Sequence, residues 1–328
     1  MKKFSIAAVA AFALATGSAS AADLPVKAKP IVAPAPPAWD LAFGAAIASD
    51  YIFHSVTQSN HRASVAVYFE PRYNINKDLY LYAGLGGASI DFPNRAAAEV
   101  DFYAGFRPTF GPVAFDFGGW YYYYPGGQCF AAQPGTMQSC SPSGGVVPQS
   151  LPNGNAIKDD LSFWEVYGKV NYTVNDNIAL GGYVYYSPSV LNSGASGVFF
   201  GGTAKYTFAA FSNGVQPYVS GEVGHWSLGT SDSFYGIPGT AFAVGIPYKD
   251  YTTWNAGFGW TWKVFTVDLR YVDTNLNKAD CNAFTSDHTA AASASISTIN
   301  PGGVGSNWCG GRFVARLSAD LTINTNLK

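Results

Sequence analysis

Residues 98–124 read AEVDFYAGFRPTFGPVAFDFGGWYYYY, and the spacing of their charges decides the fold class. Glu99, Asp101 and Arg107 stand at odd-numbered positions, while the even-numbered positions from Val100 to Phe106 are apolar. A β-strand turns successive side chains to opposite faces, so one face of this segment is charged and the other is apolar. The turn Gly111-Pro112 then separates two segments of about ten residues, the length of a tilted strand that crosses a bilayer. The stretch predicts two neighbouring membrane-spanning strands.

The same alternation recurs along the chain. It predicts twelve strands, at residues 39–53, 62–73, 79–88, 98–110, 113–124, 161–173, 177–187, 197–210, 215–226, 250–262, 264–273 and 311–323. Short turns and longer segments alternate between them, as periplasmic turns and extracellular loops do in outer-membrane proteins. We therefore predict an all-β fold, a closed antiparallel transmembrane β-barrel of twelve strands. Closure would remove every sheet edge from the lipid. An even number of strands would place both chain termini in the periplasm.

A soluble β-sandwich is the alternative class, because its strands alternate in the same way. Aromatic residues on the apolar rows separate the two classes, since they gather near predicted strand ends, where a membrane has its headgroups. The predicted girdles are Trp39, Tyr73, Phe208, Trp260 and Trp262 at the turn side and Phe53, Tyr121, Tyr123, Tyr186 and Tyr271 at the loop side. This placement favours the barrel.

The composition agrees with short β-strands. Two further features argue against a helical membrane protein and against a protein that binds nucleic acid. The 328 residues include 36 glycines, 21 tyrosines and 23 phenylalanines but only two methionines. After residue 21 no run reaches the roughly 18 consecutive apolar residues of a membrane-spanning helix. The net charge of −2 gives no strong field, so nucleic acid is not expected as a partner.

The N-terminus predicts export. Met1-Lys2-Lys3 is basic, residues 4–15 are apolar, and Ala19-Ser20-Ala21 provides small residues before a cleavage site. This pattern is typical of a secretory signal peptide, here residues 1–21. Residues 22–38 are rich in proline and lack periodicity, which predicts an extended periplasmic linker. The barrel domain then covers 39–328, in the outer membrane of a Gram-negative bacterium.

The charged rows, with one tyrosine, form the predicted pore lining. It consists of Arg62, Glu70, Arg72, Glu99, Asp101, Tyr103, Arg107, Asp116, Glu165, Lys169, Lys205, Glu222, Asp268, Arg270, Arg316 and Asp320. Two interpretations are open: the charges pair into ladders inside a narrow barrel, or they line a wet pore and set its selectivity. Twelve strands lie between the filled barrels of about eight strands and the open channels of about sixteen, so size leaves both open.

The four cysteines lie in the two longest predicted loops. Cys129 and Cys140 share one loop, and Cys281 and Cys309 share the other. Export makes oxidation available, so one disulfide within each loop is predicted, with pairing between the loops as the alternative. A metal site would need closer cysteine or histidine spacing, so we expect neither a metal nor a cofactor.

One arrangement would suit catalysis. Outer-membrane phospholipases use a His-x-Ser pair on the lipid-facing side of a barrel, and His225-Trp226-Ser227 has that spacing and parity. Hydrolysis also needs a polar partner that orients the histidine, together with an oxyanion site. Asn255 is the nearest candidate, but its parity is that of the lumen. We therefore expect no enzyme and keep a lipid hydrolase as an alternative.

Four motifs carry a family resemblance. They are ASDYIF (48–53) followed by Thr57-Gln58-Ser59, EVDFYAG (99–105), YYYYPG (121–126) and EVYG (165–168). In this order they resemble the TorF-type porins, proteobacterial outer-membrane proteins of unknown function. The resemblance covers roughly residues 40–273 and implies a barrel and passive transport.

These observations lead to an expected function. We expect a porin that lets small polar solutes diffuse through a narrow, mixed-charge lumen; the alternative is a non-conducting barrel that anchors the envelope or presents its loops. Outer-membrane lipid, lipopolysaccharide and the barrel assembly machinery are the expected partners. The segment Ala22-Asp23-Leu24-Pro25 resembles the N-termini of rhizobial-type outer-membrane proteins, some of them attached to peptidoglycan, which implies that partner as well. The sequence leaves the oligomeric state open.

Overall fold

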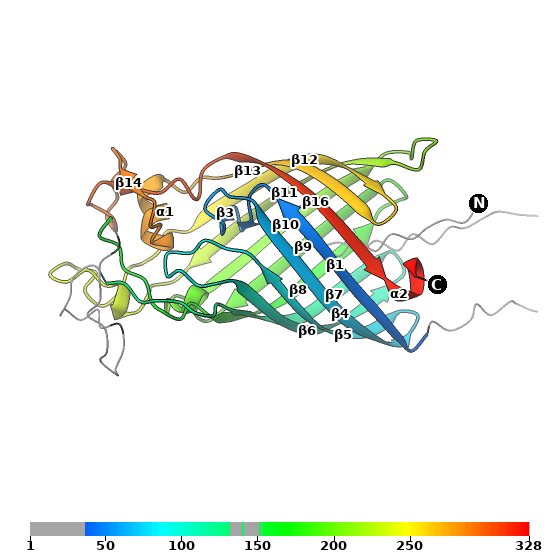
Figure 1. The fold of residues 1–328 in the computed structure, drawn as a ribbon, viewed down its shortest axis with the longest axis horizontal. Coiled ribbons are helices and arrows are strands. Elements are labelled where there is room, and N and C mark those ends of the chain that lie inside the picture. Colours follow the sequence, from blue (N-terminus) through cyan, green and yellow to red (C-terminus); the bar gives the residue numbers. More distant parts are fainter. Residues whose placement is uncertain (1–36, 132–139, 141–150, 152, 328) are drawn as a thin grey trace, which may run out of the picture.

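The structure, a computed structural model, describes residues 37–131, 140, 151 and 153–327. In these residues twelve long strands close into one antiparallel barrel, the fold predicted from the sequence (Figure 1). In chain order they are β1 (Trp39–Ala48), β4 (Ser64–Asn76), β5 (Leu79–Ala88), β6 (Glu99–Phe110), β7 (Val113–Tyr123), β8 (Phe163–Thr173), β9 (Ile178–Ser187), β10 (Gly197–Thr207), β11 (Gln216–Leu228), β12 (Tyr251–Trp262), β13 (Phe265–Thr274) and β16 (Arg312–Thr322). The predicted signal peptide 1–21 and all but the last two residues of the predicted linker lie outside the described residues.

The last strand closes the barrel against the first. Ala42 of β1 lies opposite Thr322 of β16, and Ala48 lies opposite Arg316. Short turns join the strands at the end where β1 begins and β16 ends, and long loops join them at the other end (Figure 1). In the turn between β6 and β7, Gly111 takes the positive φ that so tight a connection requires. Following the barrel rule, we call the loop end outer and the turn end inner.

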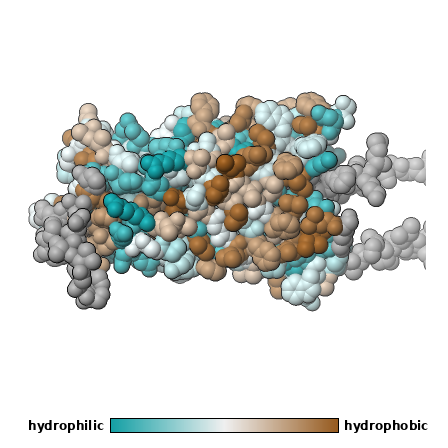
Figure 2. Space-filling view, viewed as in Figure 1, coloured by the Kyte–Doolittle hydropathy of each residue, from teal (hydrophilic) through white to brown (hydrophobic). Residues whose placement is uncertain are grey.

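The strands turn an apolar face outward. On β4, Val65, Val67 and Phe69 are 56%, 60% and 49% exposed, while Glu70 and Arg72 on the other parity are buried. Brown, hydrophobic side chains are spread over the strands in Figure 2, with hydrophilic ones toward the loop end. A closed barrel with such a wall is the β-form that hydrocarbon accepts, so the protein belongs in a Gram-negative outer membrane. Within the described residues no helix is long and apolar enough to cross a membrane.

Predicted strand ends agree with the structure to within a few residues, except around the first loop. The prediction continued the first strand to residue 53, whereas β1 ends at Ala48 and the chain turns into the barrel. Phe53 therefore packs inside against Tyr122, and its assignment to the outer aromatic girdle was wrong. An aromatic residue inside a lumen and one facing lipid have the same alternation, so parity does not distinguish them.

Smaller elements lie in the loops and at the C-terminal end. They are β2 (Ile52–Phe53), β3 (Val56–Thr57), η1 (Val190–Asn192), η2 (Ser233–Tyr235), α1 (Lys278–Thr285), β14 (Ala291–Ala292), β15 (Val304–Gly305) and α2 (Ile323–Asn326). The Asn277 side chain caps α1 by accepting a hydrogen bond of 2.8 Å from the amide of Asp280. Disulfides join Cys129 to Cys140 and Cys281 to Cys309, which confirms one pair within each loop.

Candidate functional site

The loop between β1 and β4, residues 49–63, folds into the barrel; we call it the inward loop. Its contacts reach strands all round the wall. Phe53 packs on Tyr122 of β7 and on Trp226 of β11, and Tyr251 of β12 donates a hydrogen bond to the carbonyl of His54. A segment that touches strands far apart around a closed barrel lies in its lumen.

The tip of the inward loop is a two-residue turn between the short strands β2 and β3. His54 and Ser55 have φ values of 45° and 62°, the backbone of a type I′ hairpin turn. Neither residue is glycine, asparagine or aspartate, so this conformation costs about 1–3 kcal/mol per residue unless surrounding contacts hold it. The aromatic contacts of His54 supply that support.

The His54 imidazole lies between aromatic rings. Its centroid is 3.7 Å from that of Phe199, 4.6 Å from that of Trp226 and 5.9 Å from that of Tyr185. Burial lowers its pKa from 6.5 to about 3, so the ring is neutral at ordinary pH. Its Nε2 atom is buried and has no hydrogen-bond partner. The tip therefore behaves as a neutral aromatic wedge.

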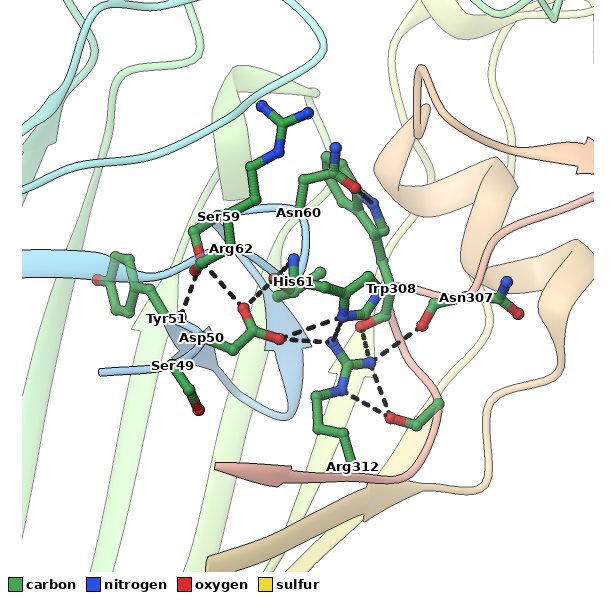
Figure 3. A network of polar contacts seen from close by, with 12 residues as sticks. Ser49, Asp50, Tyr51, Ser59, Asn60, His61, Arg62, Asn307, Trp308 and Arg312 are labelled. Carbon is green, nitrogen blue, oxygen red and sulfur yellow. Dashed lines mark hydrogen bonds and ion pairs between the residues drawn. The ribbon is translucent and has the colours of Figure 1, made fainter. Parts of the chain in front are cut away.

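A polar network ties the base of the inward loop to β16, as Figure 3 shows. The buried Asp50 carboxylate accepts hydrogen bonds from Thr57, from Ser59 at 3.0 Å and from Arg312 at 3.2 Å. His61 Nδ1 lies 3.2 Å from the same carboxylate. Arg312 also donates to backbone carbonyls of residues 307–310, at the end of the last long loop. We call Asp50 and these four partners the latch.

Further contacts fix the loop on the side of β6. The Tyr51 hydroxyl donates to Glu99 at 2.5 Å, and Tyr124 donates to the other oxygen of Glu99 at 2.9 Å. Burial and the Glu99 carboxylate raise the pKa of both phenols well above their ordinary value, so both remain donors. The inward loop is thus held from two sides of the barrel.

Large aromatic side chains close the lumen around the hairpin tip. The outer aromatic cluster, as we call it, consists of Tyr122, Phe163, Phe199, Trp226, Tyr251 and Phe284, all buried. Phe284 comes from α1, in the last long loop, and packs on Trp226. A cavity of about 40 Å³ remains beside the hairpin, lined by Phe53, Trp226 and Phe284 among others. Such a cavity has room for a few water molecules and not for a solute.

The inner half of the lumen carries ion pairs instead. Glu70 is fully buried and accepts from Arg72 at 2.7 Å and from Arg107 at 2.9 Å. Arg107 also reaches Asp116 at 2.9 Å, and its guanidinium lies 3.9 Å from the centroid of the Tyr82 ring. Each charge in this group has at least one opposite charge, as buried ions require.

A second group lies on the opposite wall. Asp268 receives both Nε and Nη2 of Arg270 at 3.0 Å and the Tyr218 hydroxyl at 2.7 Å. Arg270 continues to Ser220 and to Asn255. The fork of two parallel hydrogen bonds holds the guanidinium against the wall.

Three cations that face the lumen lack an ion-pair partner among the described residues. Across the described residues, no carboxylate lies within 4.0 Å of Lys169, Lys205 or Arg316. Lys169 and Lys205 lie over tyrosine rings, with Nζ 4.4 Å and 4.1 Å from the ring centroids. All three side chains are half-buried, and an unpaired cation is costly to remove from water, so these groups need water in the inner lumen.

The structure brings together most of the side chains predicted for the lumen. Their lumen parity places Glu70, Arg72, Arg107, Asp116, Lys169, Lys205, Glu222, Asp268, Arg270, Arg316 and Asp320 in the middle or inner part and Glu99, Asp101, Tyr103 and Glu165 in the middle or outer part. Arg62 is the exception: it precedes β4, its side chain is 74% exposed, and it pairs with Asp91 of the next loop. Left-handed turns at Asn60 and His61 take the chain out of strand geometry there.

The sequence did not reveal the inward loop as part of the site. A signal was present: the outer ends of several lumen rows carry Tyr122, Phe163, Phe199 and Trp226 where charges would be expected. Aromatic side chains that face into a lumen need apolar partners, and the inward loop supplies them.

Among the residues that the structure describes, the His-x-Ser arrangement has no carboxylate or amide partner for its histidine. The His225 ring contacts Thr252 at 3.0 Å, and Asn255 is turned inward to Arg270. Within the described residues no three His, Cys, Asp or Glu side chains are placed to hold a metal ion.

Comparison with known families adds one assignment. The profile of a family described as "Bacterial protein of unknown function (Gcw_chp)" matches residues 33–299. The chain belongs to the Gcw_chp family. The Gcw_chp match includes the inward loop and eleven of the twelve barrel strands described above, up to β13. It does not carry the TorF-type name, which stays a prediction. No curated protein matches the sequence.

Solved structures resemble this Gcw_chp barrel only distantly. The KdgM porin gives a TM-score of 0.40 at 7% identity, over 85% of this chain and 98% of that one. An outer membrane channel from Pseudomonas putida F1 gives 0.40 at 9% identity, over 91% and 100%. LpxR from Salmonella typhimurium also gives 0.40 at 9% identity, over 86% and 99%. Likeness at this level carries no argument about function.

Proposed function

We propose that the protein is an outer-membrane channel for small polar solutes, and that the inward loop closes its outer entrance in this conformation. The unpaired lumen cations carry the proposal. Lys169, Lys205 and Arg316 have lumen parity and, within the part of the chain that the structure describes, no carboxylate within 4.0 Å; a lumen that holds unpaired cations must hold water. A purely structural ladder would pair each charge.

The closed outer half explains how such a channel avoids permanent leakage. The outer aromatic cluster and the hairpin tip fill the lumen there, but the hairpin belongs to a loop and not to a strand. Its removal leaves every barrel strand and every strand-strand hydrogen bond in place. The closure is therefore separable from the wall.

Single-channel recording in a planar bilayer tests the proposal. One variant replaces residues 51–58 by a short Gly-Ser linker; the matched control is Asp176→Asn, a substitution at an exposed residue in the turn between β8 and β9, at the end of the barrel away from the inward loop. We expect rare or small conductance steps from the wild type and from the control, and large steady steps from the loop variant.

The main alternative is a barrel that conducts nothing and serves the envelope through its loops. Silence of the loop variant, in protein shown to be folded by its heat-modifiable migration, would favour that alternative and contradict the channel. A lipid hydrolase at His225 and Ser227 has less support, because within the described residues the only side-chain hydrogen-bond partner of His225 is Thr252. Lipopolysaccharide, the assembly machinery and peptidoglycan remain proposed partners.

A further inference from the structure

The hairpin tip combines three properties that together describe a switch. Its backbone is held in a conformation that His54 and Ser55 do not favour. Its imidazole is enclosed by aromatic rings, and one ring nitrogen has no partner. The latch and the Tyr51–Glu99 hydrogen bond hold the arms of the loop, whereas aromatic contacts and one hydrogen bond from Tyr251 hold the tip, so the tip can leave without breaking the wall.

We propose that the inward loop is an acid-released gate, in which protonation of His54 expels the hairpin tip from the outer aromatic cluster and opens the lumen. This inference rests on the proposed channel function and adds its regulation.

The surroundings of His54 offer nothing that would stabilise an imidazolium by charge. Phe53 of its own hairpin, Phe199 of β10 and Trp226 of β11 are apolar or uncharged. Tyr185 of β9 and Tyr251 of β12 are the titratable side chains that face it, and both are neutral phenols. Within the described residues no carboxylate contacts the ring. The carboxylates of Glu165 and Glu222 interact electrostatically with Tyr185 and do not contact His54. A proton on His54 therefore meets an apolar shell.

The direction of the pH effect follows from the lowered pKa. The closed state holds His54 with a pKa of about 3, and an expelled, hydrated imidazole returns to about 6.5. The closed state is therefore fully favoured above pH 6.5 and loses stability as the pH falls toward 3. The ratio of open to closed hairpin rises about tenfold for each pH unit in this range, which is about 30-fold at pH 5.

Two readouts on the full-length mature barrel test the gate. Planar-bilayer conductance at pH 7.5 and pH 5.0 measures opening. Methyl NMR of Val56, which is buried next to the hairpin tip and pairs with Phe53, reports the hairpin position whether or not the barrel conducts. We expect both signals to change with acid in the wild type.

Three variants separate His54 from other acid-sensitive groups. His54→Phe keeps an aromatic wedge but cannot be protonated, so both signals should stay at their neutral-pH values. His225 is on the lipid-facing side of β11, so His225→Gln should respond like the wild type. His61→Gln alters the histidine that contacts Asp50 in the latch and should also keep the response.

The possible outcomes are distinct. A Val56 signal that does not change in the wild type between pH 7.5 and 5.0 overturns the gate, as does an equal acid response in His54→Phe. Loss of the response in His61→Gln alone would move the switch to the latch and also overturn the proposal. A Val56 change without conductance supports the moving hairpin and contradicts the channel.

Discussion

The outer and inner halves of the lumen contain different kinds of side chain. The outer half is filled with aromatic side chains and a loop, whereas the inner half is lined with ion pairs and unpaired cations. Apolar packing excludes water and stabilises the fold in proportion to the apolar area that is buried. Ion pairs tolerate water and keep a fixed geometry because their hydrogen bonds are directional. The difference shows that closure and selectivity are properties of separate layers, which substitutions can change independently.

The largest expected effect on stability comes from Glu70→Ala in the inner half. Glu70 is 0% exposed and is the carboxylate shared by Arg72 and Arg107. Its removal leaves Arg72 without a paired anion inside the wall, so we expect a loss of about 3–5 kcal/mol in the free energy of unfolding. Urea unfolding of the refolded barrel in detergent measures it.

A matched substitution in the outer half sharpens the comparison. The Glu99 carboxylate receives only the two phenols of Tyr51 and Tyr124, so Glu99→Ala leaves no unpaired ion. We expect it to cost about 1–3 kcal/mol, less than Glu70→Ala. Equal losses at the two sites would show that the inner ion pairs are not distinctive.

Trp226→Ala, in the outer aromatic cluster, should have the next largest effect. Trp226 is 2% exposed and contacts Phe53, His54 and Phe284. Truncation of a buried tryptophan costs about 3–5 kcal/mol, and we expect the lower end because Trp226 already borders the cavity beside the hairpin and has fewer packed contacts to lose. The same substitution should raise single-channel conductance, since it removes part of the closure.

Trp226→Phe is the matched control, because it keeps an aromatic ring at this position. It should retain most of the stability and the low conductance. A Trp226→Ala barrel that is destabilised but no more conductive than the wild type would mean that the outer cluster is not what closes the lumen.

The barrel could be predicted from the sequence because lipid and lumen impose a period of two on every strand. The pattern of Val65, Val67 and Phe69 against Glu70 and Arg72 is enough to orient β4. The inward loop could not, because Tyr51 and Phe53 continue the alternation of β1 while their surroundings change from lipid to lumen. Parity identifies the two faces of a strand, and only the three-dimensional contacts show where the strand ends.

The same limit explains why the position of Arg62 was wrongly predicted. Arg62 is also the site of the smallest expected effect. The alternation places Arg62 in the lumen with Arg107, but its left-handed neighbours leave it exposed at the rim beside Asp91. An exposed ion pair contributes about 0.2–1 kcal/mol, so Arg62→Gln should change the free energy of unfolding by no more than that. Ion selectivity in the conducting loop variant should also stay unchanged.

Arg107→Gln removes the same charge from the inner lumen and is the matched comparison. Arg107 pairs with Glu70 and Asp116, so its loss leaves excess negative charge along the path and should shift the reversal potential toward cations. If Arg62→Gln shifted the reversal potential as much as Arg107→Gln, rim charges would control selectivity, and the inner layer would lose the role argued for it. If only Arg107→Gln does so, the layer of ion pairs is the selective part of the lumen.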